Sequence, residues 1–181
     1  MTELEKVLVD QLKDHSTIQL FKEILGESKY SRSRLLLAGG AVVDIIEGRK
    51  PKDFDFVEWR DDDLVKFREA GFKHTYTTKS SITMEKDGIE VQFISFSLKQ
   101  FGFKIEQSNY NIVREVLTID EDSFTNNVLI PVSFKELQNL RSAAFRIPHW
   151  IKKGYHIPDM TYLSLMSCAF GALTSSKHKN S

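Results

Sequence analysis

Cysteine, net charge and long apolar runs are what this chain has least of. Its 181 residues include one cysteine, Cys168, which excludes an internal disulfide and a zinc site built from several cysteines. Lysine plus arginine and aspartate plus glutamate each number 25, so no global field attracts nucleic acid or anionic lipid. No apolar run could span a bilayer, and no secretory signal opens the chain. We therefore expect a cytoplasmic protein without a membrane partner.

The residues that are present are sufficient for a folded domain with a substantial core. Hydrophobic residues make up 41% of the chain, and 181 residues fit one domain, or one domain with a small appendage. The five histidines are dispersed without ligand spacing, so we assign no zinc site. Any binding of nucleic acid must then depend on a local constellation of side chains rather than on composition.

The most informative stretch is LLLAGGAVVDIIEGRKPKDFDFVE, residues 35–58. An apolar run ends at Gly39-Gly40, a short amphipathic segment follows, and a second apolar run carries Asp53 and Asp55. This order predicts a strand, a glycine turn, a short helix and a second strand. The glycine pair would let backbone N–H groups approach a phosphate chain, and the helix N-terminus that follows would favour an anion.

Asp53 and Asp55 carry the chemistry of this stretch. Residues two apart in a strand share a face, so the two carboxylates lie on one side while Phe54 and Phe56 point into the core. Two carboxylates on one face are unfavourable unless a cation lies between them. Mg²⁺ takes oxygen ligands and keeps positions open for phosphates, which indicates metal-assisted phosphoryl or nucleotidyl transfer.

Residues 39–56, GGAVVDIIEGRKPKDFDF, resemble the nucleotide-binding motif of the DNA polymerase β-like nucleotidyltransferases, and within them the CCA-adding enzymes and bacterial poly(A) polymerases. The matching positions are Gly39, Gly40, Val42, Asp44, Gly48, Asp53 and Asp55. The resemblance implies that Asp53 and Asp55 are catalytic and bind Mg²⁺ or Mn²⁺, and that Gly39, Gly40 and Asp44 contact the nucleotide. Val43 departs from the pattern, because that family usually has an arginine there.

A third carboxylate is expected from a later strand. Residues 88–93, GIEVQF, resemble the strand of the same family that carries a glutamate, which falls on Glu90. The resemblance implies that Glu90 is the third catalytic and metal-binding carboxylate; the alternative is an ordinary exposed strand residue. Alternation places Glu90 and Gln92 on the polar face. Three strands, over residues 72–78, 80–86 and 89–95, are expected here, with Asp87-Gly88 as a hairpin turn.

The C-terminal third resembles the helical neck of the family. Residues 140–146, LRSAAFR, are similar to its neck helix, which implies that Arg141 and Arg146 face the nucleotide; structural salt bridges are the alternative. Pro148 is expected to break or kink this helix. Gly102 stands where the family has an aspartate, and the acidic partner of the base-selecting motif is missing before Arg141.

Together these features predict an α+β protein with a mixed β-sheet and packing helices, followed by a short helical neck. We expect helices over residues 2–25, with a break near residues 14–17, and over 64–70, 135–153 and 159–173, and a connecting region over 114–131. The expected domains are a nucleotidyltransferase domain at 1–115, a neck-like region at 116–174 and a disordered tail at 175–181.

The leading functional hypothesis is an Mg²⁺-dependent nucleotidyltransferase that moves an NMP from an NTP to an acceptor hydroxyl. ATP or CTP is the favoured nucleotide, and an RNA 3′ end is the favoured acceptor, with a protein or small-molecule hydroxyl left open. One alternative is a non-catalytic module that binds nucleotide or RNA, which Val43 and Gly102 favour. Another is a partner protein of the toxin–antitoxin type, which would bind no nucleotide.

Overall fold

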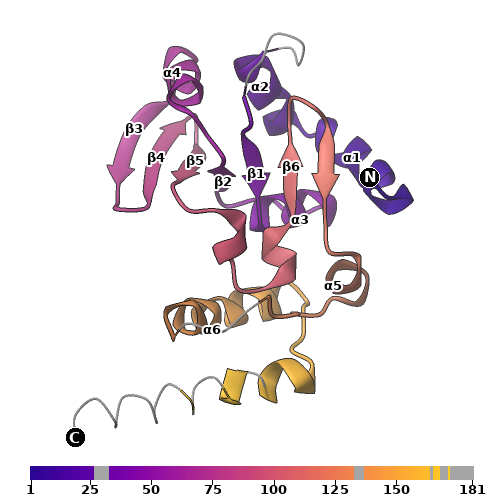
Figure 1. Ribbon diagram of the computed structural model, residues 1–181. Coiled ribbons are helices and arrows are strands. Elements are labelled where there is room, and N and C mark those ends of the chain that lie inside the picture. Colours follow the sequence, from indigo (N-terminus) through magenta and orange to yellow (C-terminus); the bar gives the residue numbers. More distant parts are fainter. Residues whose placement is uncertain (27–32, 133–136, 164, 168–170, 172–181) are drawn as a thin grey trace, which may run out of the picture. The chain divides into compact units, whose positions relative to one another are not determined.

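The computed structural model describes residues 1–26, 33–132, 137–163, 165–167 and 171, with the side chains of 137–142 left out (Figure 1). The chain divides into two compact units. The first unit comprises residues 1–98 and 108–119, and the second comprises 99–107 and 120–181. The domain boundaries expected from the sequence lie after residues 115 and 174, whereas the chain passes between the two units after residues 98, 107 and 119. The expected tail at 175–181 lies outside the described residues.

The first unit is a seven-stranded mixed sheet with four helices (Figure 1). The strands, in chain order, are β1 (Leu36–Ala38), β2 (Phe54–Val57), β3 (Lys73–Thr77), β4 (Ser81–Lys86), β5 (Ile89–Ile94), β6 (Asn109–Asn111) and β7 (Val116–Thr118). The helices are α1 (Glu3–Lys13), α2 (Ser16–Leu25), α3 (Gly40–Ile46) and α4 (Asp61–Glu69). The spatial order β3-β4-β5-β2-β1-β6-β7 contains one parallel pair, β2 with β5. The predicted α+β class with a mixed sheet is confirmed.

The aromatic core lies on one face of the sheet, under helices α2 and α4. Phe21 of α2 meets Phe54 and Phe56 of β2 edge-on, with ring centroids 5.1 and 5.2 Å apart. Phe67 of α4 packs on Phe93 of β5 at 5.2 Å. Edge-to-face pairs of this kind each contribute about 0.5–1.5 kcal/mol beyond the burial of their area. The core face of β2 is thereby fixed, and so is the opposite face, which carries the acidic residues.

Several local predictions are confirmed in detail. The break in the N-terminal helical segment falls between α1 and α2, with His15 as the N-cap of α2. Asp87 and Gly88 have φ of 52° and 77°, the pair of positive values that a two-residue type I′ hairpin requires. Asp63 accepts a hydrogen bond from the backbone N–H of Arg60, 2.9 Å away, so this aspartate stabilises the first turn of α4.

The connecting region expected at 114–131 is wrong, because it contains regular structure. Strand β7 closes the edge of the sheet beside β6, and a short helix, α5 (Glu121–Asn126), follows it. Asp120 caps this helix by accepting from the backbone N–H and the hydroxyl of Ser123, at 3.0 and 2.7 Å. Three residues of strand and six of helix are too short to show a hydrophobic period.

The second unit contains the helix α6 (Leu137–Lys152), a 3-10 turn at Lys104–Gln107 and α5. The expected break at Pro148 is wrong, because α6 continues through this residue. A proline removes a single intrahelical hydrogen bond. Trp150, two residues further on, is buried and bonded to Glu106, which offsets that loss.

The last helix is only partly described, with helical residues at 159–163, 165–167 and 171. An apolar helix here would be expected to bury Leu163 and Met166, but their exposed fractions are 60% and 42%. Thr161 is buried and its hydroxyl donates to the carbonyl of Leu129 at 2.9 Å. The helix is therefore anchored by Thr161 and turns its larger apolar side chains outward. Cys168 lies outside the described residues.

Candidate active site

A polar row crosses the sheet on the face opposite the aromatic core. Asp55 lies opposite Ala38 of β1 and opposite Gln92 of β5, and directly paired residues share a face of a sheet. Continuing these pairings outward gives the members of the row, which are Thr83, Gln92, Asp55, Ala38, Asn109 and Thr118. Ala38 is buried, and Asp55 beside it is only partly exposed.

Two further carboxylates, those of Asp53 and Glu90, lie near enough to act on Asp55. Phe54 pairs with Val91, so one step back along both strands brings Asp53 beside Glu90. Burial, followed by the negative charges of Asp53 and Glu90, raises the pKa of Asp55 from 3.8 to about 7. A carboxyl group whose pKa is raised to near neutrality by burial and by neighbouring carboxylates is typical of a site that receives a cation or a proton.

Glu90 is held in place by its neighbour on β5. The side-chain amide of Gln92 donates to Oε1 of Glu90 across 3.0 Å. The two residues are two positions apart on one strand and share its polar face, as the alternation predicts. This hydrogen bond restricts the rotation of the Glu90 side chain.

The glycine turn lies at the end of β1, beside this acidic site. Gly39 has φ of 62° and ψ of −126°, a conformation that L side chains rarely adopt, so glycine is needed there. Its N–H donates to the carbonyl of Ser108 at 2.8 Å. The N–H of Gly39 is thus engaged within the fold, and contact of Gly39 and Gly40 with a nucleotide stays a prediction. Gly39 shapes the turn, and the first N–H of α3 that lacks an intrahelical acceptor belongs to Gly40.

The donor set of Asp53, Asp55 and Glu90 fits a hard divalent cation. In the described part of the chain, no three His, Cys, Asp or Glu side chains already form a cluster close enough to hold a metal ion. Mg²⁺ is commonly held by one or two carboxylates, with substrate phosphates and waters completing its octahedron. The mutual repulsion that raises the pKa of Asp55 is the feature that a bound cation would relieve.

Asp44 is buried and engaged with Arg49. Its Oδ1 accepts from Nε of Arg49 at 2.9 Å, and its carbonyl accepts from the backbone N–H of the same residue at 2.7 Å. The guanidinium also pairs with Glu47. This arrangement stabilises the chain between α3 and β2, and so the spacing between the glycine turn and the two aspartates. Contact of Asp44 with a nucleotide stays a prediction.

Arg146 belongs to the second unit, where it pairs with a buried glutamate. Its Nε and Nη2 donate to the two oxygens of Glu106 at 2.5 and 3.0 Å. Trp150 Nε1 and the backbone N–H of Phe103 also donate to Glu106, at 3.0 and 3.1 Å. With four donors around one carboxylate, the structural salt bridge is the role that the geometry supports. The side chain of Arg141 is outside the described residues, and its nucleotide contact stays a prediction.

Three contacts in these arrangements, made by Ser108, Glu106 and Gln92, have no recognisable signal in the sequence. Ser108 is 69 residues from Gly39, and Glu106 is 40 residues from Arg146, so neither partnership has a local period. Gln92 is visible as a member of the polar face, but its bond to Glu90 depends on side-chain rotamers. Val43, in the place of an arginine, is fully buried, which accounts for its apolar character.

Comparison with known proteins finds relatives by structure only. No family model matches the sequence, and no curated protein matches it. A CCA-adding enzyme of Thermotoga maritima, solved with tRNA, superposes with a TM-score of 0.68 and 16% identity over 90% of this chain and 44% of that one. CCA-adding enzyme complexes with ATP and with CTP give TM-scores of 0.69 and 0.67, at 16% and 15% identity.

These matches cover 94% and 92% of this chain, but 46% and 44% of the solved ones, so the chain spans less than half the length of those enzymes. At this level of identity the likeness concerns the fold. The resemblance read from residues 39–56 is confirmed at that level: the chain has the fold that CCA-adding enzymes use over the corresponding part of their length.

Proposed function

We propose that this protein is a nucleotidyltransferase that moves an NMP from an NTP to an acceptor hydroxyl, with an RNA 3′ end as the acceptor. The observation that carries the proposal is that the charges of Asp53 and Glu90 act on Asp55, beside the Gly39–Gly40 turn. The fold shared with CCA-adding enzymes supports it, because solved examples hold tRNA, CTP or ATP.

Asp53 and Asp55 would hold one or two Mg²⁺ or Mn²⁺ ions, with Glu90 as the third carboxylate. When bound there, such a cation would supply Lewis-acid polarisation of the α-phosphate and charge stabilisation for the leaving group. The acceptor oxygen forms a bond to the α-phosphorus, the bond from that phosphorus to the bridging oxygen breaks, and pyrophosphate leaves. The proton of the hydroxyl passes to a carboxylate of the site. Gln92 keeps Glu90 directed toward this reaction.

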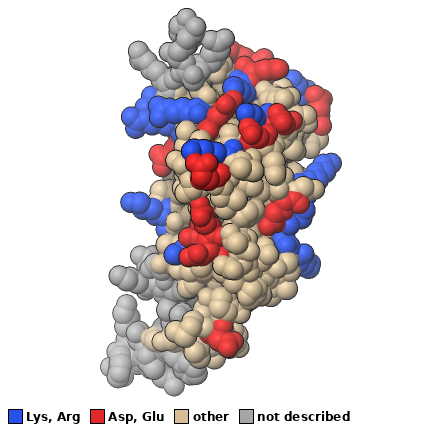
Figure 2. Space-filling view, turned by 90° about the vertical axis from the view of Figure 1, so that its right-hand side faces the viewer, with Lys and Arg blue, Asp and Glu red and all other residues tan. Residues whose placement is uncertain are grey.

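Recognition of RNA would be local rather than driven by a global field. The formal net charge is zero, and on the face shown in Figure 2 acidic and basic side chains are interspersed. Counterion release from the phosphate backbone supplies most non-specific affinity for nucleic acid, so that affinity should be weak here. We expect the acceptor to be selected by its end and by contacts near the site.

A second candidate is a module that binds nucleotide without transferring it. Two positions that are polar in the family have no polar side chain here. Val43 is fully buried, and a Cβ added to Gly102 would lie 3.0 Å from Cβ of Ala143, so neither position has space for the arginine or aspartate. This candidate predicts NTP binding that depends on Asp53 and Asp55, without pyrophosphate release.

The deciding experiment incubates the protein with each α-³²P-labelled NTP, Mg²⁺ or Mn²⁺, and total RNA. The Asp53→Asn/Asp55→Asn variant serves as the matched negative, and Asp62→Asn, an exposed aspartate of α4, as the charge-matched control. Label should enter RNA with the wild type and Asp62→Asn and be absent with the double variant. NTP binding without label in any acceptor would favour the second candidate, and label that persists in the double variant would refute the mechanism.

A further inference from the structure

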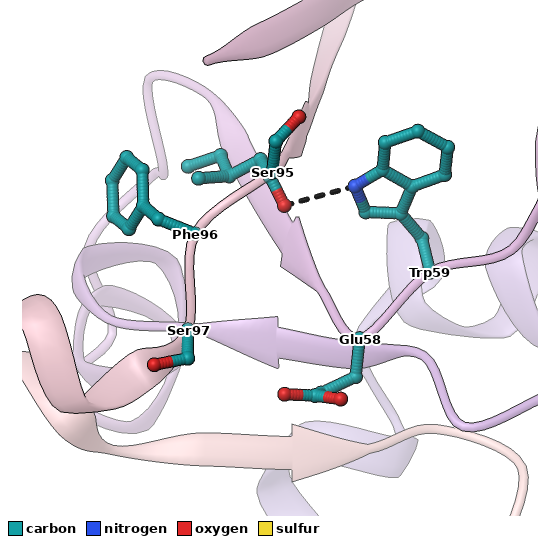
Figure 3. A pocket seen from close by; sticks show the side chains of 6 residues that line it. Glu58, Trp59, Ser95, Phe96 and Ser97 are labelled. Atoms are coloured by element: carbon teal, nitrogen blue, oxygen red, sulfur yellow. Dashed lines mark hydrogen bonds between the residues drawn. The ribbon is translucent and has the colours of Figure 1, made fainter.

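A second hollow lies beyond the carboxyl ends of the parallel strands β2 and β5. Its volume is about 340 Å³, and it is lined by Glu58, Trp59, Ile94, Ser95, Phe96 and Ser97 (Figure 3). Ligand sites of about 300–1,000 Å³ are usual, and the crevice beyond the carboxyl ends of parallel strands is a recurrent place for them. None of these residues belongs to the acidic site described above.

The aromatic part of the hollow is held in place by the protein itself. Trp59 Nε1 donates to the carbonyl of Ile94 at 2.9 Å, and its ring stands edge-on to the buried Phe93 with centroids 6.0 Å apart (Figure 3). Phe96 contributes a second ring on the other side of Ser95 in this view. An aromatic ring held in this way offers a stacking surface that loses little side-chain entropy on binding.

The polar part of the hollow consists of acceptors and hydroxyls. Glu58 is exposed, has φ of 55°, and makes no hydrogen bond or ion pair within the described part of the chain. In Figure 3 its carboxylate extends from the end of β2 toward Ser97. The six lining residues include no cation. Such a lining repels phosphate and accepts hydrogen bonds from N–H groups, which suits a planar group that carries donors and no negative charge.

A nucleobase with an exocyclic amino group meets each of these conditions. Its face stacks on an aromatic ring, its amino group donates to a glutamate, and its ring nitrogen accepts from a serine hydroxyl. Uracil lacks the exocyclic amino group, and its one ring donor, N3–H, lies between two carbonyl oxygens that the Glu58 carboxylate repels. Cytosine, whose amino group pairs with glutamate in nucleic-acid recognition generally, gives the clearest contrast with uracil because the two rings have the same size.

The distance from the acidic site assigns this base to a neighbouring nucleotide. Glu58 is three residues beyond Asp55, about 10 Å along a strand. A base held in the hollow therefore suits the nucleotide next to the one whose hydroxyl reacts at Asp55. We infer that the hollow binds an amino-bearing base of the acceptor strand, upstream of the reacting hydroxyl, and thereby selects acceptors by sequence. This inference rests on the proposed function, since it takes RNA as the acceptor.

The test uses 5′-fluorescein-labelled trinucleotides rCCC and rUUU, with fluorescence anisotropy of the full-length protein. We expect the wild type to bind rCCC on the order of tenfold more tightly than rUUU, the discrimination usual for a good amino–carboxylate contact. Glu58→Gln, whose amide both donates and accepts, should reduce the preference to less than about twofold. Trp59→Leu should weaken both ligands about tenfold by removing the stacking surface.

Glu69→Gln, an exposed glutamate of α4, is the matched control and should keep the wild-type preference. Circular dichroism melts would show that Trp59→Leu is folded. Equal affinity for rCCC and rUUU in the wild type would overturn the inference, as would an undiminished preference in Glu58→Gln. Spermidine that competes with rCCC only when Glu58 is present, without any base preference, would indicate a cation site and would also overturn it.

The same measurements separate this inference from the proposed function. The Asp53→Asn/Asp55→Asn variant should lose transfer and keep the rCCC preference, because its substitutions lie outside the hollow. A base preference in a protein that transfers no nucleotide would retain the hollow as a base site and refute the function. Transfer to RNA by a protein with no base preference would support the proposed function and refute the base site.

Discussion

Replacing Asp55 by asparagine should make the protein more stable at pH 8 and leave its stability nearly unchanged at pH 4. Burial and the charges of Asp53 and Glu90 raise the pKa of Asp55 from 3.8 to about 7. The folded state therefore holds a proton between these two values that the unfolded state releases. The stabilisation from that proton is complete below the unfolded pKa and is lost as the pH rises through about 7.

The full difference between 3.8 and about 7 corresponds to about 4 kcal/mol in the free energy of unfolding. Asp55 is only partly buried, so water screens some of the repulsion, and we expect about 2 kcal/mol. Asparagine has nearly the same shape and carries no charge, so Asp55→Asn should gain that amount at pH 8. For a chain of this length, such a gain raises Tm by about 4–8 °C.

The assay is urea unfolding of both proteins at pH 4, 6 and 8 in EDTA, which removes divalent cations. Asp62→Asn is the control: this exposed residue lies in the first turn of α4, where a negative charge is favourable, so its loss should cost about 0.3–1 kcal/mol. A difference between Asp55→Asn and wild type that is the same at pH 4 and pH 8 would refute the electrostatic reasoning. So would a variant that is less stable than wild type at pH 8.

Three further outcomes are expected. At pH 8, millimolar Mg²⁺ should raise the Tm of the wild type by a few degrees in differential scanning fluorimetry and leave the Tm of Asp53→Asn/Asp55→Asn unchanged. The reason is that only the wild type offers the paired carboxylates. Equal Tm shifts in the two proteins would contradict the metal assignment. Gly102→Ala should lower the free energy of unfolding by about 1–3 kcal/mol in urea, because its new Cβ would lie 3.0 Å from Cβ of Ala143. In the control Gly171→Ala the new Cβ meets nothing within 4 Å, so this variant should lose no stability. Glu106→Gln should lose about 3 kcal/mol, because it leaves Arg146 and two N–H donors around an uncharged group; a loss below about 1 kcal/mol would show that this network is not a source of stability.

The sequence predicted those parts of the fold whose determinants are local. The glycine turn between β1 and α3 follows from residues within a few positions of each other, and so does the Asp87-Gly88 hairpin. The alternation of β2 and β5 determines which side chains share a face, so the pattern of residues alone was enough to assign Asp53, Asp55 and Glu90 to polar faces. Convergence of the three carboxylates needed only the additional fact that β2 and β5 are neighbours.

Features that depend on distant partners could not be predicted. The N–H of Gly39 is bonded to Ser108, and no pattern within residues 35–58 indicates that acceptor. Arg146 matched a helix motif, but the side chain that holds it comes from a 3-10 turn 40 residues earlier. Strand β7 and helix α5 were missed because each is shorter than the window over which a hydrophobic period becomes visible.

The energetics of Asp55 bear on whether the site is catalytic or a remnant of the fold. Its ionised carboxylate lowers stability by about 2 kcal/mol at neutral pH, a sizeable share of the roughly 5–15 kcal/mol that hold a typical domain together. The core beneath it does not need the charge, because Phe54 and Phe56 alone fix the position of β2. Asparagine would fill the same space without the repulsion. A protein that bound no nucleotide would gain stability from that single change, whereas a site that receives a cation, for transfer or for binding alone, needs the charge. The carboxylate of Asp55 is therefore better explained by cation binding than by folding.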